Sequence, residues 1–470
     1  MKKLVLLLLA FLSLQLSAQE LKLKKGAVVD NIKVGDSLPY SFSLLLPSNF
    51  TVNKKWPVVF IVDYNNREKQ VIRLMASIAE EKGYILAASN NLNDTISISK
   101  NILAFTKTFN SVVGMLPIDE NQIYTTGFNR AGRLATTIPA FISNIDGVLS
   151  YSSTVGNIEI INVKKPYQYI GIVSGYNFNY TEMLANKELL NKLKIPNQLL
   201  IEESRNNWPS TNNLATALDL FKMSAMAKGN LAVDSLFINN NYNTTLTTIN
   251  KLVAANKLKK AKNLIDQTIM VYKPFKKIDS LKDKSNALRK NKIYKSLKRA
   301  ENNVWFKEQS LKNDFAYYVE EDAYTHNFNN LGWWAHQTKE IDKFKNSTNQ
   351  EQQKMGYRLE GYLVALTNDY IDTVLAEKNT DYDALSFLYM LKTIIAPKDY
   401  DSYLKIISLS AKNNDFGTSI FYLEELLKNG YTNADKLYNL ESTTLLKLTP
   451  EYNALIEKYL KKGRFILEEE

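Results

Sequence analysis

Imidazole and thiol groups, the side chains that most often drive acyl transfer, are scarce in this chain. Its 470 residues include no cysteine and only two histidines, His326 and His336. A serine nucleophile needs a base that takes its proton, and histidine is the usual one. Because residues 1–325 contain no histidine, a histidine-based acyl-transfer site made from them is excluded by composition. The lack of cysteine likewise excludes a thiolate nucleophile and a zinc–thiolate centre.

The clearest chemical pattern lies between Asp119 and Ser153. A β-type run at 122–126 leads into Gly127-Phe128-Asn129-Arg130-Ala131-Gly132, and a helical stretch follows. A strand that enters a helix through a tight glycine-containing turn lifts one side chain above the sheet, where the helix N-terminus can stabilise an oxyanion. Asn129 occupies that raised position.

Before residue 235, short apolar runs alternate with helical segments. Several runs are continuously apolar, as expected for strands covered on both faces. This alternation predicts an α/β fold with a mostly parallel sheet and flanking helices. The expected strands are 44–46, 57–62, 84–88, 122–126, 147–151, 169–173 and 198–201, and the expected helices are 69–82, 97–113, 132–142, 181–194 and 212–227.

The turn at Gly127–Gly132 resembles the nucleophile elbow, G-x-S-x-G, of the α/β-hydrolases. Asn129 stands at the serine position and Ala131 at that of the second glycine. The resemblance covers roughly residues 38–225. Together with the Ala88-Ser89-Asn90-Asn91 stretch, the elbow looks like the exported esterase and polyhydroxybutyrate-depolymerase-like branch of that superfamily.

The same resemblance assigns the other two members of a Ser-His-Asp triad. Asn177, in the loop after the run at 169–173, matches the acid. Asn206, before Asn207-Trp208-Pro209, matches the histidine of an H-x-W-P pattern. Asparagine can neither form an alkoxide, nor accept a proton as imidazole does, nor carry the acid's charge. The resemblance therefore implies a hydrolase frame with a degenerate triad.

Other routes to catalysis stay open. A Ser-Lys dyad could use Ser89, Ser152, Ser153 or Ser174, although no spacing selects one, and His326 or His336 could reach the site from the second half. Asp63 follows an expected strand where an oxyanion loop would lie, and we expect its carboxylate to bond to the backbone. We find no phosphate-binding loop, dinucleotide fingerprint, calcium loop or metal-ligand cluster, so no cofactor or metal is expected.

After residue 235 the strand signal fades and helical periodicity dominates. The apolar positions around 252–265 predict a helix-turn-helix unit. The segment 411–427 resembles a tetratricopeptide unit, but no clean 34-residue period follows. We therefore predict an α/β-hydrolase-like domain at 19–235 and an α-helical, tetratricopeptide-like domain at 236–470.

The first 18 residues have the form of a secretory signal peptide. Lys2 and Lys3 precede an apolar run from Leu4 to Leu12, and Ser17-Ala18 supply small residues for cleavage. We therefore expect an exported protein, periplasmic or extracellular, with no transmembrane segment in the mature chain.

Positive charge is concentrated between residues 251 and 300. This window holds sixteen Lys or Arg against three Asp, a net charge of +13, whereas the whole chain carries +11. Such a stretch is typical of a solvated helical surface, and it could also contact an anionic surface. Nucleic acid is not an expected partner outside the cell.

These observations favour an exported pseudo-hydrolase that binds or scaffolds a protein, peptide or glycan of the cell envelope or exterior. The former cleft would be lined by Asn129, Arg130, Asn177, Asn206 and Trp208. The helical half would contribute its basic stretch and Trp333-Trp334. One alternative is an active esterase or peptidase-type hydrolase with a non-standard nucleophile, because Gly127 and Gly132 are kept. Another is that the helical half alone carries the function.

Overall fold

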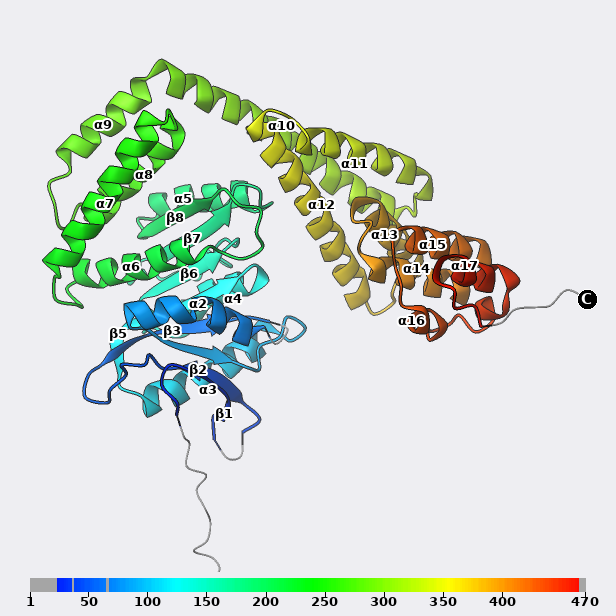
Figure 1. Ribbon diagram of the computed structural model, residues 1–470, viewed down its shortest axis with the longest axis horizontal. Coiled ribbons are helices and arrows are strands. Elements are labelled where there is room, and N and C mark those ends of the chain that lie inside the picture. Colours follow the sequence, from blue (N-terminus) through cyan, green and yellow to red (C-terminus); the bar gives the residue numbers. More distant parts are fainter. Residues whose placement is uncertain (1–22, 36–37, 65–66, 465–470) are drawn as a thin grey trace, which may run out of the picture. The chain divides into compact units, whose positions relative to one another are not determined.

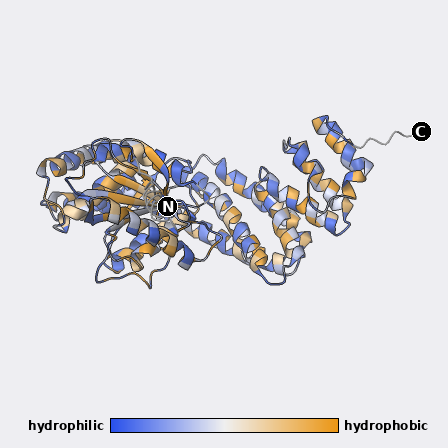
Figure 2. Ribbon diagram, turned by 90° about the horizontal axis from the view of Figure 1, so that it is seen from below, coloured by the Kyte–Doolittle hydropathy of each residue, from blue (hydrophilic) through white to orange (hydrophobic). Residues whose placement is uncertain are grey.

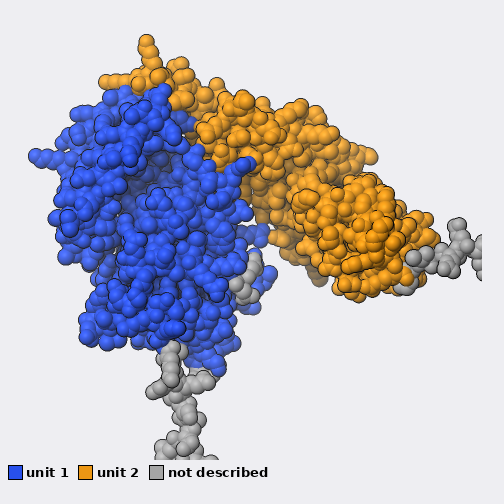
Figure 3. All heavy atoms as spheres, in the orientation of Figure 1, with its two compact units in different colours: residues 1–174, 182–288 blue, residues 175–181, 289–470 orange. Residues whose placement is uncertain are grey.

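The computed structural model describes residues 23–35, 38–64 and 67–464 (Figure 1). The predicted signal peptide lies outside these residues. The chain forms two compact units (Figure 3): the first contains the described residues up to Ser174 together with Glu182–Leu288, and the second contains Gly175–Thr181 and the described residues from Arg289 onward.

The described part of the first unit contains an eight-stranded sheet with the order β1-β2-β4-β3-β5-β6-β7-β8. β2 is antiparallel to both β1 and β4, and the remaining pairs are parallel. The strands are β1 (Val28–Lys33), β2 (Ser41–Leu45), β3 (Trp56–Val62), β4 (Ile85–Ser89), β5 (Ile118–Phe128), β6 (Gly147–Tyr151), β7 (Gln168–Ser174) and β8 (Asn197–Glu202).

Helices cover both faces of this sheet. In β3, Val58 and Phe60 point to opposite faces from Val59 and Ile61, because neighbouring side chains alternate along a strand. The first face packs against α3 (Ile98–Met115), α4 (Arg130–Thr137) and α5 (Tyr180–Lys192), and the second against α2 (Glu68–Lys82) and α6 (Thr211–Ala227).

The predicted fold class is confirmed: a mostly parallel, α/β-hydrolase-like sheet precedes a helical region, and all seven expected strands are present. The strands are largely hydrophobic (Figure 2), since both of their faces are covered. The additional strand β1 lies at the sheet edge and buries only Ile32, so it carries little of the apolar pattern that marks the others.

The first unit continues beyond the predicted domain limit at residue 235, where α7 (Ser235–Ala254) begins. α8 (Leu258–Tyr272) pairs with α7 as the predicted helix-turn-helix unit, and α9 (Asp279–Lys290) follows. α8 packs against the sheet region: its Gln267 side chain donates to the main-chain oxygen of Leu199 in β8. α7 and α8 therefore belong to the same unit as the sheet.

The described part of the second unit is helical apart from the segment Gly175–Thr181. Its helices differ widely in length, so no constant repeat is seen, and the tetratricopeptide likeness stays a prediction. They are α10 (Lys292–Tyr324), η2 (Phe328–Asn330), α11 (Leu331–Lys345), α12 (Gln350–Ala376), α13 (Tyr382–Ile395), α14 (Tyr400–Lys412), α15 (Phe416–Lys428), α16 (Ala434–Tyr438), η3 (Leu446–Leu448) and α17 (Pro450–Leu460).

Buried charges hold the segment Gly175–Thr181 within the second unit. Arg358 of α12 donates to both carboxylate oxygens of Glu308 of α10 and, at 2.8 Å, to the main-chain oxygen of Gly175. Lys312, also buried, donates to the main-chain oxygen of Phe178 at 3.1 Å. The loop between β7 and α5 is thus bonded to α10 and α12.

No helix among the described residues is long and apolar enough to cross a membrane. The basic stretch 251–300 falls on the end of α7, α8, α9 and the start of α10, so it is divided between the two units.

Candidate functional site

The turn between β5 and α4 has an unusual backbone conformation at Asn129. Its φ is 54° and its ψ is −125°, the angles of the first central residue of a type II′ turn, which favours glycine. The Asn129 N–H donates to the main-chain oxygen of Tyr151 at 2.9 Å, and Gly132 N–H donates to the oxygen of Asn129 at 2.9 Å. The side chain of Asn129 is exposed, so the turn lifts it above the carboxyl edge of the sheet.

The two glycines of this turn are required by packing. A Cβ atom on Gly127 would lie 2.5 Å from the main-chain oxygen of Ala131, and one on Gly132 would lie 2.8 Å from the Cβ of Ser153. Real Cβ atoms do not approach other atoms this closely. The glycines are therefore explained by the tight crossing of β5, α4 and β6, whether or not the turn performs catalysis.

Asn206 and Trp208 lie near this turn, in the loop after β8. The hydroxyl of Tyr151 donates to the main-chain oxygen of Asn206 at 2.9 Å. The ring of Trp208 meets that of Phe128, the residue before Asn129, edge to face with 5.7 Å between centroids. The structure thus brings together the elbow and the position predicted for the histidine.

Asp63 is the first residue after β3, next to β5 in the sheet. Its side chain is buried; Oδ1 accepts a hydrogen bond from Arg67 at 2.8 Å, and Oδ2 has no hydrogen-bond partner among the described residues. The partner of the carboxylate is therefore a guanidinium, not the backbone as expected. The Arg67 guanidinium also lies 5.7 Å from the ring of Trp208, which connects Asp63 to the elbow through Trp208.

Arg130 and Tyr64 complete the described polar groups around the elbow. The Arg130 side chain is 56% exposed, and its guanidinium is 3.9 Å from the Asp94 carboxylate. Burial raises the pKa of Tyr64 to about 12; Asp94 adds to this rise and Arg130 opposes it. Tyr64 therefore keeps its proton at neutral pH and can act as a hydrogen-bond donor.

Asn177, the position predicted for the acid, belongs to the second unit. Its Oδ1 accepts the N–H of Asn179 at 2.9 Å, and its main-chain oxygen accepts the N–H of Tyr180 at 3.0 Å. These bonds form the turn that leads into α5, so the described role of Asn177 is local.

The four serines considered for a Ser-Lys dyad are all at least 97% buried: Ser89, Ser152, Ser153 and Ser174. Ser174 donates to the main-chain oxygen of Ser204, and Ser153 donates to that of Thr154 at 3.4 Å. Burial and these bonds make them poor positions from which to attack a substrate.

Both histidines and the paired tryptophans lie in the second unit. His326 bonds to the carboxylate of Asp381, which caps α13, at 2.8 Å. His336 is 64% exposed and 3.8 Å from Glu340. Trp334 is fully buried and donates to Asp322 at 2.8 Å, so its expected role in surface binding is wrong: it is a core residue. Within the described ranges, no group of three His, Asp or Glu side chains could hold a metal ion.

No protein-family model matches the chain, and no curated protein matches it. Solved structures similar to it include the serine hydrolase FphF of Staphylococcus aureus (11% identity, 42% of this chain and 97% of that one, TM-score 0.34). They also include Est1E from Butyrivibrio proteoclasticus (11% identity, 43% of this chain and 99% of that one, TM-score 0.34). A third is esterase 2 of Thermogutta terrifontis (12% identity, 45% of this chain and 99% of that one, TM-score 0.35).

The site therefore offers amide, guanidinium and aromatic groups, with a buried carboxylate behind them. Tyr64, Arg67, Asp94 and Tyr151 were not predicted from the sequence. Arg67 could have been found from its spacing of four residues after Asp63. Tyr151 gives no sequence signal, because its two bonds reach residues 22 positions before and 55 positions after it.

Proposed function

We propose that this protein is an exported pseudo-hydrolase, which uses the elbow at Asn129 to bind a partner of the cell envelope or exterior rather than to cleave esters. The observation that carries the proposal is the elbow itself: it keeps a strained turn but raises an asparagine in place of a nucleophile. A backbone conformation of this kind costs on the order of 1–3 kcal/mol and is found mainly at functional sites.

The carboxylate of Asp63, in the loop beside the elbow, supports the absence of acyl transfer. An oxyanion hole needs hydrogen-bond donors, of which one comes from the loop after the third strand. In that loop this chain has the buried carboxylate of Asp63, whose Oδ2 is an unused acceptor. A carboxylate at this place offers an oxyanion no hydrogen-bond donor, and its charge is paired with Arg67.

The test is turnover of a panel of short-chain aryl esters by the purified protein beside the Asn129→Ala and Asn129→Ser variants. We expect wild type and Asn129→Ala to be equal to a reaction without protein. Turnover by wild type that Asn129→Ala abolishes would overturn the proposal. Asn129→Ser restores the hydroxyl but no histidine, so we expect it to be inactive as well.

An active hydrolase with a non-standard nucleophile is the second candidate, and the strain at Asn129 is the observation that favours it. The retained glycines do not, because packing alone requires them. A serine-reactive fluorophosphonate, followed by mass spectrometry of peptides, separates the two candidates. Labelling of one residue supports the second; an unlabelled chain supports binding.

Export has its own test, because it rests on the first 18 residues. The protein is expressed in its native host, and the N-terminal residue of the protein outside the inner membrane is determined. We expect the chain to begin at Gln19. A chain that stays in the cytoplasm with Met1 in place would overturn this part of the proposal.

A further inference from the structure

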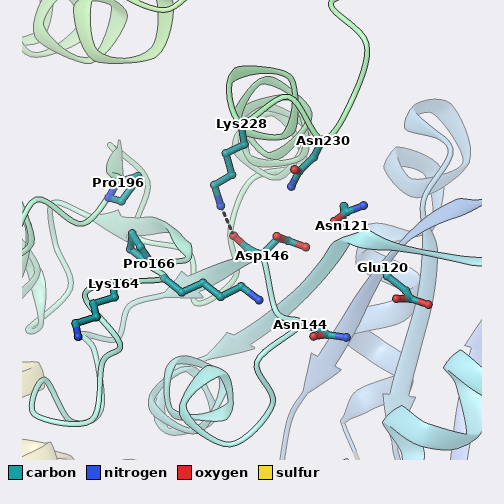
Figure 4. A pocket seen from close by; sticks show the side chains of 10 residues that line it. Glu120, Asn121, Asn144, Asp146, Lys164, Pro166, Pro196, Lys228 and Asn230 are labelled. Atoms are coloured by element: carbon teal, nitrogen blue, oxygen red, sulfur yellow. Dashed lines mark hydrogen bonds between the residues drawn. The ribbon is translucent and has the colours of Figure 1, made fainter.

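A second polar concavity lies at the opposite edge of the sheet, at the amino ends of β5 to β8. This amino-edge hollow has a volume of about 430 Å³. Asp146 lies just before β6 and Lys228 just after α6 (Figure 4). Lys165 lies shortly before β7. Volumes of this order are typical of sites for small molecules.

Two ammonium groups approach the hollow around Asp146. Lys228 Nζ is 3.5 Å from the main-chain oxygen of Asp146, and the two residues face each other in Figure 4. Lys165 Nζ donates to the main-chain oxygen of Ser143 at 2.9 Å. Each ammonium group carries three donors, so these bonds leave donors available to a ligand.

The carboxylate between these lysines has an unused acceptor. Oδ2 of Asp146 is buried and makes no hydrogen bond within the described residues. Burial raises the pKa of Asp146, and burial together with the Lys165 ammonium lowers the pKa of Lys228 although Asp146 opposes this. Burial thus disfavours the charged form of both side chains, and a ligand that bonds to them would favour it.

We propose that the amino-edge hollow binds a small hydroxylated carboxylate, of the type of a hexuronate. Its carboxylate would accept from Lys165 and Lys228, and a hydroxyl would donate to the Asp146 carboxylate, which lines the hollow. The donor is a hydroxyl rather than an ammonium, because the three lysines that line the hollow outnumber its two carboxylates, Glu120 and Asp146, and repel a cation.

The remaining polar lining consists of Glu120, Lys164 and three asparagines, and the asparagines fit the other hydroxyls. Asn121, Asn144 and Asn230 each present an amide with both donors and an acceptor, which matches the donor and acceptor of a hydroxyl. The apolar residues of the lining are Pro166 and Pro196, and the lining includes no aromatic ring. This composition favours a polyhydroxylated anion over an aromatic or lipid-like ligand.

The test is calorimetric titration of the purified full chain with D-glucuronate, D-glucose and acetate at one salt concentration. We expect glucuronate to bind and the other two not to bind in the same range. Equal binding of acetate would mean a simple anion site, equal binding of glucose a neutral sugar site, and no binding an empty hollow. Each of these results overturns the proposal.

Two variants locate the binding. Lys228→Met removes the ammonium but keeps the stem, and Asp146→Asn keeps the shape but removes the charge; each is expected to weaken glucuronate binding about tenfold or more. Lys100→Met, which changes an exposed lysine of α3, is the matched control and leaves binding unchanged. Circular dichroism and the unfolding midpoint of each variant without ligand show that it is folded. Unchanged binding by folded Lys228→Met and Asp146→Asn would overturn the proposed site.

Discussion

The hydroxyl of Tyr151 donates a 2.9 Å hydrogen bond to the main-chain oxygen of Asn206, 55 residues later in the chain. The main-chain oxygen of the same tyrosine accepts the N–H of Asn129. One residue at the end of β6 therefore bonds to both the elbow and the loop that contains Asn206, the position predicted for the histidine. Burial raises the pKa of Tyr151 to about 12, so the hydroxyl stays a donor through the neutral range.

Tyr151→Phe removes this bond and keeps the ring. We expect a loss of stability of about 0.5–1.5 kcal/mol, the usual net value of one hydrogen bond, and faster protease cleavage of the loop 203–210. The measurements are the urea midpoint and mass spectrometry of a limited digest. Tyr324→Phe, at an 83% exposed tyrosine, is the control. Unchanged cleavage of the loop would show that the bond does not hold it.

Gly127→Ala tests whether packing or chemistry keeps the elbow glycines. The new Cβ would lie 2.5 Å from Ala131 O, so we expect destabilisation of about 1–3 kcal/mol by thermal unfolding. Gly114→Ala is the matched control: it lies in α3 with no atom within 4 Å of the new Cβ, and alanine favours a helix by about 0.5–1 kcal/mol. If Gly127→Ala unfolds like wild type, the close packing at Gly127 is not required for the fold.

Arg358→Met tests the bonds that hold the segment Gly175–Thr181 in the second unit. Removing the guanidinium deprives buried Glu308 of its bidentate partner but leaves the Lys312 ammonium 3.4 Å away. Breaking a buried pair typically costs about 3–5 kcal/mol, so we expect a loss toward the lower end of that range. We expect a lower unfolding midpoint by calorimetry and new protease cleavage within 175–181. Arg299→Met, at an exposed position of the same unit, leaves both unchanged. An unaltered midpoint for Arg358→Met would contradict this role.

The same bonds affect how the helical half is tested alone. A chain that lacks residues 19–235 also lacks Gly175–Thr181, and leaves Arg358 and Lys312 without their main-chain acceptors. Loss of partner binding by that deletion would therefore be expected even if the helical half carries the function. Point variants of the exposed basic residues are the sharper test.

Stability of the α7 start is expected to depend on pH. Asp234 caps α7; the N–H of Phe237 and then the Lys222 ammonium hold its pKa below the ordinary value. A lowered folded pKa means that the charged form stabilises the fold above the unfolded pKa of about 3.9, and that this is lost as the pH falls through the folded value.

Asp234→Asn keeps a capping side chain but removes the charge. We therefore expect a lower unfolding midpoint than wild type at pH 7 and a difference that shrinks toward pH 3. Asp283→Asn, at an exposed carboxylate of α9, serves as the control at both pH values. A difference that is the same at pH 7 and pH 3 would show that the charge of Asp234 is not its source.

Several features of this protein were determined by the sequence alone. The absence of histidine before residue 326 is a matter of composition and needs no structure. The seven strands were predictable because strands covered on both faces are continuous apolar runs, and Asn129 was singled out because glycines bracket it at the end of such a run. These are local signals, carried by neighbouring residues.

Tertiary structure decided what depends on residues far apart in the chain. The bonds from Tyr151 to Asn129 and Asn206, the Arg67 contact with Trp208, and the placement of Gly175–Thr181 among α10 and α12 all join distant segments. Trp334, expected at a binding surface, is buried for the same reason. A residue's type and spacing predict the element that it belongs to, whereas its contacts depend on how the elements pack, and packing is set by many weak interactions at once.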